Sequence, residues 1–218
     1  MLATLTILIM LGVGYAYYRE GLLTASTMAC NVLVAGLFAF NFWEPMADVL
    51  EPVLHGYADA VCLMFLFGLA LGLLRLATNR LAGAVVAFHP RVQQAGGALF
   101  GAVTGYLASG FLVCVLQTLP WHEHFLGFDG ESAEGESALR GLLPPDGAWL
   151  ALMRRAGAYP LSNRVDGAVP EPADLYDTYI TFDKYSTFEL RYQRYRRYGD
   201  HRDPLPYHGE LDAQLHRR

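Results

Sequence analysis

The chain has 218 residues and a mean hydropathy of +0.23; 53% of its residues are hydrophobic and 17% are charged. The charged fraction is far below the roughly 25% of soluble domains, which excludes an ordinary soluble enzyme. The net charge of −5 gives no basic field, so nucleic acid is excluded as the main partner. Residues 1–121 hold only four arginines and five acids, so the apolar character belongs to the first half of the chain.

Four long apolar stretches in this half predict membrane-spanning α-helices. A hydrocarbon core about 30 Å thick needs about 20 helical residues, because each residue advances the helix by about 1.5 Å. We expect spans at residues 2–18, 22–43, 57–76 and 96–119. A cleaved signal peptide is the main alternative for the first stretch, but no basic residue precedes its apolar run.

Arginines beside the expected spans predict the orientation of the protein. They gather on one side of the membrane and are Arg19, Arg75, Arg80 and Arg91. The opposite side has no Lys or Arg before Arg140, so the positive-inside rule places both termini outside the cytoplasm. On that opposite side, Pro45 and Pro52 are expected to break the connection between the second and third spans.

Small residues spaced four apart predict helix faces that another backbone can approach closely. In the fourth span these residues are Gly97, Gly101, Gly105 and Ser109. Gly68 and Gly72 repeat the spacing once in the third span. The two faces could pack together or against a second copy of the chain, and we favour packing within one chain, because lipid provides no hydrophobic drive between helices.

Polar residues are rare inside the expected spans. Asn31 is the main one, and we expect it to hydrogen-bond to another helix rather than to contact a substrate. No acid, base or histidine lies in the middle of a span, which argues against an ion-coupled pump.

Two glycine-bearing junctions carry a resemblance to a known family. The first span ends at the charged turn Arg19-Glu20-Gly21-Leu22, and the fourth opens with Gly97-Ala98-Leu99-Phe100-Gly101-Ala102-Val103-Thr104-Gly105. In these junctions, and in the order and lengths of its four spans, the chain resembles the colicin V production protein (CvpA) family over residues 2–120. The chain departs from that family where charged residues are common: it has Thr4 and Thr6 early in the first span, Gln93-Gln94 before the fourth, and Thr104 before the last glycine.

The resemblance implies a non-enzymatic, multi-pass protein of the bacterial inner membrane, linked to toxin (colicin V) production or export and to envelope homeostasis. A small channel or transporter subunit, assembled through the glycine-bearing helices, is the alternative function. The expected partners are the lipid bilayer and either further copies of the chain or other envelope membrane proteins.

The second half is expected to form a polar tail outside the cytoplasm, residues 122–218, partly helical and partly disordered. Residues 122–143 form an acidic, glycine-rich linker, and a short helix is expected at about residues 146–156. The apolar face of that helix suits either the membrane–water interface or packing on a neighbouring domain. The complete fold class is therefore an all-α membrane protein with four transmembrane helices followed by this tail.

Residues 174–198 are rich in tyrosine and arginine, above all in Arg191-Tyr192-Gln193-Arg194-Tyr195-Arg196-Arg197-Tyr198. Such a segment can stack on single-stranded nucleic acid or contact anionic headgroups and cell-wall polymer. Because the tail is net acidic, a solvated helix with pairs of Tyr and Arg side chains is the favoured interpretation.

No motif predicts catalysis or a cofactor. His122 and His124 alternate, but no third ligand or cysteine accompanies them, so no metal site is expected. Ser109 lies in a Leu-Ala-Ser-Gly sequence that could suit an intramembrane protease, but no histidine lies inside a span to act as its base. Nucleotide-binding glycine loops are absent from the sequence, so no small-molecule substrate is identified.

Overall fold

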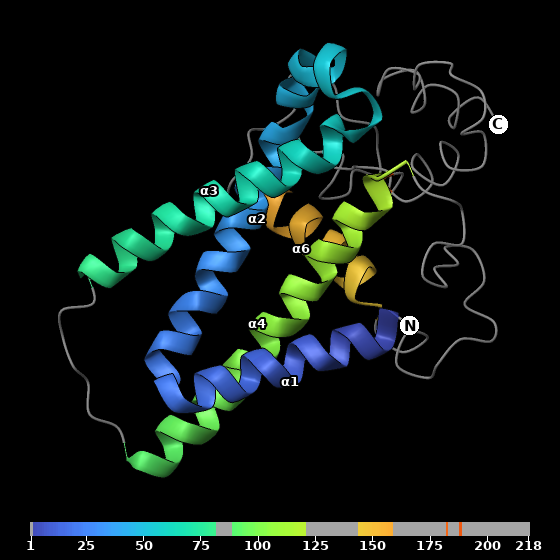
Figure 1. Ribbon diagram of the computed structural model, residues 1–218. Helices are drawn as coiled ribbons and strands as arrows, with labels where there is room; N and C mark the ends of the chain where they lie inside the picture. Colours follow the sequence, from blue (N-terminus) through green and yellow to red (C-terminus); the bar gives the residue numbers. More distant parts are fainter. Residues whose placement is uncertain (1, 82–88, 121–143, 159–181, 183–187, 189–218) are drawn as a thin grey trace, which may run out of the picture.

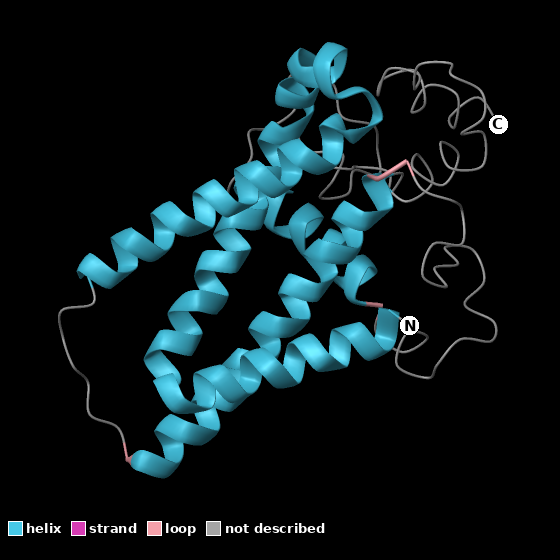
Figure 2. Ribbon diagram, in the orientation of Figure 1, coloured by secondary structure: helices cyan, strands magenta, loops and turns pink. Residues whose placement is uncertain are grey.

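The computed structural model describes residues 2–81, 89–120, 144–158, 182 and 188, and every element in this part of the chain is a helix (Figures 1 and 2). The elements are α1 (Leu2–Glu20), α2 (Leu22–Leu54), the short 3-10 helix η1 (His55–Tyr57), α3 (Ala58–Leu81), α4 (Pro90–Thr118) and α6 (Pro145–Ala158). The helical fold class expected from the sequence is thus confirmed for these residues.

The four long helices alternate in direction. Figure 1 shows that α1 and α3 end, and α2 and α4 begin, on the same side of the molecule. All four predicted topology residues, Arg19, Arg75, Arg80 and Arg91, belong to these helix ends, so we call this side the basic end. The other side, where α2 passes through η1 into α3, carries Glu44, Asp48, Glu51 and Asp59, and we call it the acidic end.

Gly21 alone joins α1 to α2. Its φ of +101° lies in a region that L side chains rarely adopt, so glycine is required at this reversal. The Gly21 amide donates to the Tyr17 carbonyl oxygen at 2.9 Å, and the Gly21 carbonyl oxygen accepts from the Ala25 amide at 3.1 Å. The charged turn predicted at residues 19–22 is therefore a single-residue connection between two helices.

The predicted break at Pro45 and Pro52 is wrong, because α2 continues through both prolines to Leu54. A proline inside a helix removes one backbone donor and leaves a carbonyl oxygen four residues earlier without its helical partner. Both prolines are exposed, so the disturbed turns lie on the surface rather than in the core. The helix has 33 residues as a result, well beyond the span expected at residues 22–43.

α4 also exceeds its predicted span, beginning at Pro90 instead of residue 96. His89 caps the helix, since its Nδ1 accepts a hydrogen bond from the Arg91 amide at 3.4 Å. Proline at the first helical position suits this start, because the missing N–H has no helical partner there.

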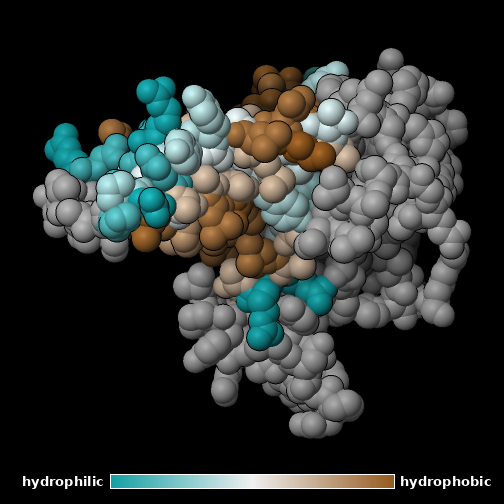
Figure 3. Space-filling model, turned by 90° about the horizontal axis from the view of Figure 1, so that it is seen from below, coloured by the Kyte–Doolittle hydropathy of each residue, from teal (hydrophilic) through white to brown (hydrophobic). Residues whose placement is uncertain are grey.

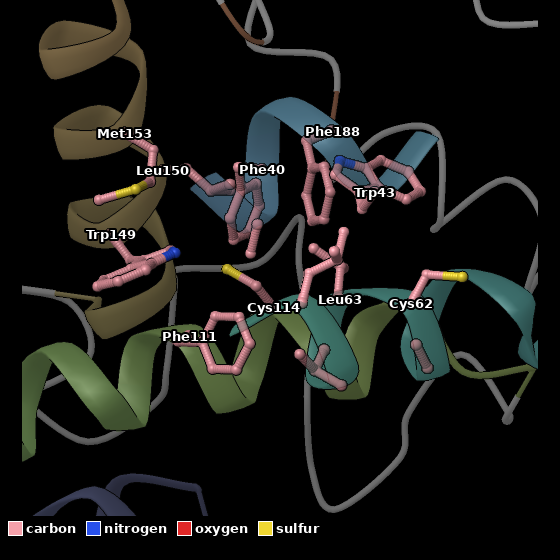
Figure 4. Packing of buried hydrophobic residues seen from close by; sticks show 14 of the residues in the cluster. Phe40, Trp43, Cys62, Leu63, Phe111, Cys114, Trp149, Leu150, Met153 and Phe188 are labelled. Atoms are coloured by element: carbon pink, nitrogen blue, oxygen red, sulfur yellow. The ribbon is translucent and has the colours of Figure 1, made fainter. Parts of the chain in front are cut away.

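The buried core lies away from the basic end. It joins the C-terminal half of α2, the N-terminal half of α3, the C-terminal half of α4, and α6. Figure 4 shows Phe40 and Trp43 of α2, Leu63 of α3 and Phe111 of α4 around Trp149 of α6 and Phe188. α6 thus belongs to the same core as the long helices.

Large apolar side chains also cover the outer faces of the long helices. The most exposed include Leu8, Leu11, Val34, Phe42, Phe65, Leu73 and Leu99, each at least half exposed. Figure 3 shows hydrophobic residues over the middle of the molecule, with hydrophilic residues next to them where α3 ends and α4 begins. By length and composition, two helical stretches, Leu22–Arg80 and Pro90–Thr118, could cross a membrane.

Candidate functional site: the glycine ridge and the α6 seat

The predicted small-residue face of α4 packs against α1. We call Gly97, Gly101 and Gly105 the glycine ridge. A Cβ added at Gly97 would overlap the Tyr17 carbonyl oxygen, and one at Gly105 would lie 2.8 Å from Met10 Cα. At Gly101 the same atom would lie 3.0 Å from Gly14 Cα, so two glycines meet where the helices cross. Only glycine allows this backbone approach, and the ridge therefore serves packing within one chain.

Ser109 continues the spacing of the ridge. Its hydroxyl donates to the Tyr106 carbonyl oxygen at 2.7 Å, within α4 itself. The next small residue, Gly110, faces α6 instead of α1. The small-residue face of α4 therefore serves α1 along the ridge and α6 beyond Ser109.

Gly68 and Gly72 of α3 are exposed. A Cβ added to either residue would meet nothing within 4 Å. The two small-residue faces predicted from the sequence therefore do not pack together.

Asn31 joins α2 to α3. Its Nδ2 donates to the Thr78 hydroxyl at 3.1 Å, and that hydroxyl donates to the Arg75 carbonyl oxygen at 3.2 Å. Asn31 is buried and Thr78 half-buried, so the pair holds the two helices together close to the basic end. The polar anchor chosen from the sequence thus has a helix partner.

The four arginines of the basic end are exposed. Close by, the Tyr18 hydroxyl donates to Gln94 Oε1 at 3.3 Å, which ties the last turn of α1 to the first turns of α4.

α6 occupies a seat formed by α2 and α4. The predicted short helix at about residues 146–156 is present as Pro145–Ala158. Its seat, which we call the α6 seat, is lined by Gly36, Phe40, Gly110, Phe111 and Gln117. A Cβ at Gly36 would overlap the Trp149 ring and lie 3.1 Å from Met153 Sδ, while one at Gly110 would lie 2.9 Å from Trp149 Cβ. Two glycines on different helices thus make room for one indole.

Aromatic rings complete the surroundings of Trp149. Its ring centroid lies 5.9 Å from that of Phe111, which stacks on Phe67 of α3 at 3.9 Å. Phe40 lies 6.3 Å from the Trp149 ring on the other side and 5.9 Å from Phe188. Edge-to-face and tilted ring pairs of this kind contribute about 0.5–1.5 kcal/mol each beyond their buried area.

A buried polar contact stabilises the start of α6. Gln117 Nε2 donates to Asp146 Oδ2 at 2.7 Å, and both side chains are almost completely buried. A hydrogen bond to an ionised carboxylate is about twice as strong as one between neutral groups. Asp146 also lies in the first turn of α6, where a negative charge interacts favourably with the helix dipole.

The α6 seat was missed in the sequence, although α6 itself was predicted. Gly36 and Gly110 repeat at no regular spacing, and Gln117 is a single polar residue at the end of an apolar helix. The one signal was the apolar Trp, Leu and Met face of α6, which requires burial somewhere.

Among residues 2–81, 89–120 and 144–158, no three His, Cys, Asp or Glu side chains gather to hold a metal. Cys62 and Cys114 are buried and Cys30 is exposed, and none of the three forms a disulfide within the described residues. The predicted linker 122–143, the alternating histidines and the Tyr/Arg segment 174–198 lie outside the described residues, apart from Phe182 and Phe188.

Comparison with known proteins identifies no relative. No protein-family model matches the chain, and neither the search of curated proteins nor the search of solved structures returns a match.

Proposed function

We propose that the chain is a non-enzymatic, multi-pass protein of the bacterial inner membrane, in which α1, α2, α3 and α4 each span the bilayer. The observation that carries this proposal is the apolar outer surface of the four helices. Soluble monomers rarely expose contiguous apolar patches larger than a few hundred square ångströms. Here exposed leucines, valines and phenylalanines occur on every long helix, while the buried core is confined to one side.

The distribution of charge supports an orientation with both termini outside the cytoplasm. Arg19, Arg75, Arg80 and Arg91 lie at the basic end, and the acidic end holds four of the acids. Under the positive-inside rule the basic end faces the cytoplasm. α6 and the buried core then lie toward the outer side of the membrane.

As its cellular role we propose the one implied by the resemblance to CvpA: support of toxin production or export and of envelope homeostasis, through contacts with other membrane proteins. The channel alternative relied on the glycine ridge as an assembly surface. That ridge has less room for a second copy, because α1 already lies against Gly97, Gly101 and Gly105.

Paired fusions at the C-terminus test the topology. One fusion carries an enzyme active only outside the cytoplasm, and the other a fluorescent protein that matures only inside it. We expect enzyme activity without fluorescence, from protein that stays in the membrane pellet after alkaline carbonate extraction. Fluorescence without enzyme activity would require an odd number of spans and would overturn the four-span topology.

The cellular role is tested by deletion and complementation. In a host that secretes colicin V, we expect loss of the gene to reduce the secreted toxin, and the wild-type gene to restore it. Normal secretion from the deletion strain would contradict the role in toxin production while leaving the membrane topology untouched.

A further inference from the structure

We propose that the basic end binds the headgroup of an anionic membrane phospholipid, whose acyl chains lie against the apolar side chains next to the arginines. This inference rests on the proposed membrane location. It adds a ligand class and a binding surface to that proposal.

The arginines of this surface come from three separate helices. Arg19 lies in the last turn of α1, Arg75 and Arg80 in the C-terminal part of α3, and Arg91 in the first turn of α4. The α1 and α4 contributions are held together by the hydrogen bond from Tyr18 to Gln94, and α3 is tied to α2 by the one from Asn31 to Thr78. The first contact fixes the helix ends that carry Arg19 and Arg91, and the second fixes the part of α3 that carries Arg75 and Arg80.

The charge of this surface is suited to a phosphate group. All four guanidinium groups belong to exposed residues, and Glu20 is the one acid on the described helix turns that carry them. Guanidinium groups bind phosphate oxygens through paired hydrogen bonds, and they are hydrated more weakly than ammonium groups. A headgroup with a net negative charge is thus a better match than a zwitterionic one, in which a cation accompanies the phosphodiester and would face the arginines.

The neighbouring surface is apolar, which distinguishes a lipid from a free phosphate. Leu76 is 64% exposed beside Arg75, and Leu73 is 59% exposed about one turn earlier on α3. On α4, Val92 follows Arg91 directly and is 52% exposed, and Leu99 is 65% exposed two turns later. Figure 3 shows hydrophobic residues beside the hydrophilic ones on the face that it draws. An amphiphile with an anionic head and acyl chains uses both parts of the surface, whereas an inorganic anion uses the arginines alone.

The test measures which lipids the purified full-length protein retains. The protein, in a neutral detergent, is equilibrated with equal amounts of phosphatidylglycerol and phosphatidylcholine, and the bound lipids are counted by native mass spectrometry. We expect the wild type to retain phosphatidylglycerol over phosphatidylcholine by at least about fivefold, and Arg80→Gln or Arg91→Gln to reduce that preference by about fivefold each. Arg155→Gln, which removes an exposed arginine of α6, is the matched control and should retain the wild-type preference.

Three outcomes overturn the lipid site. They are equal retention of the two lipids by the wild type, equal losses in Arg91→Gln and Arg155→Gln, and complete displacement of phosphatidylglycerol by millimolar inorganic phosphate. Alkaline carbonate extraction of the same variants separates this failure from failure of the proposed function. Wild-type protein in the membrane pellet without lipid preference contradicts the site alone, whereas wild-type protein in the soluble fraction contradicts both proposals.

Discussion

Trp149 packs so closely over Gly36 that a Cβ at the glycine would overlap the indole ring. Gly36 lies in α2, more than 100 residues before the tryptophan, so this contact joins an early helix to the last described one. The fit between the two residues accounts for the position of α6 within the core, and it leads to the first prediction.

Gly36→Val is expected to displace α6 from its seat. Valine would clash with the Trp149 ring and with Met153 Sδ, and overpacking of this kind costs about 1–3 kcal/mol. The measurement is the free energy of unfolding in detergent, together with the fluorescence emission of the tryptophans. Gly68→Val is the matched control, because a Cβ there meets nothing within 4 Å. If the two substitutions changed the free energy of unfolding equally, the effect would come from replacing a helical glycine in general and not from a clash with Trp149.

Trp149→Ala is expected to destabilise the protein strongly. The side chain is completely buried between α2 and α4, and removing a buried tryptophan costs about 3–5 kcal/mol. Phe42→Ala serves as a control, since Phe42 is 52% exposed on the outer face of α2. Thermal unfolding in detergent should show a large fall in Tm for Trp149→Ala and little change for Phe42→Ala. A similar fall for both would mean that α6 does not occupy its seat in the purified protein.

Asp146→Ala is expected to lower stability by leaving the buried Gln117 amide without its acceptor. An unsatisfied buried polar group costs about 1–3 kcal/mol, whereas replacing both partners by apolar groups is nearly neutral. Gln117→Leu in the Asp146→Ala background should therefore recover part of the lost free energy of unfolding. The double-mutant cycle gives the coupling energy of the pair, and a coupling near zero would contradict the contact.

Gly101→Leu is expected to separate α1 from α4. The new side chain would meet the backbone at Val13 and Gly14, which cannot move without shifting the whole helix. We expect a lower Tm and loss of an engineered disulfide between cysteines placed at Gly14 and Ala102, since a Cβ at Gly14 would lie in ordinary contact with Ala102, 3.8 Å from its Cα. Gly72→Leu is the control, because Gly72 faces open space. An unchanged cross-link in Gly101→Leu would exclude the ridge as the contact between the two helices.

The long helices were predictable because each contains an apolar run of sufficient length, and Gly21 marked the reversal between the first two. The end of α2 was not predictable from the sequence. A proline such as Pro45 indicates a helix break unless its exposure on the surface is known. For the glycine ridge, the regular spacing indicated a packing face but could not name α1 as the partner. The α6 seat depends on single residues from separate helices, Gly36, Gly110 and Gln117, and such a set has no periodicity that a sequence pattern can reveal.

The place of α6 in the core sets the order in which the molecule can be completed during its synthesis. The long helices all leave the ribosome before α6, and the α6 seat on α2 and α4 lacks its tryptophan until Trp149 has been made. In the proposed topology that segment must also cross the membrane before it can dock. Nascent chains that stop before residue 145 should therefore hold an inserted but incompletely closed bundle, and in that topology the docking of α6 follows its translocation rather than insertion of the long helices.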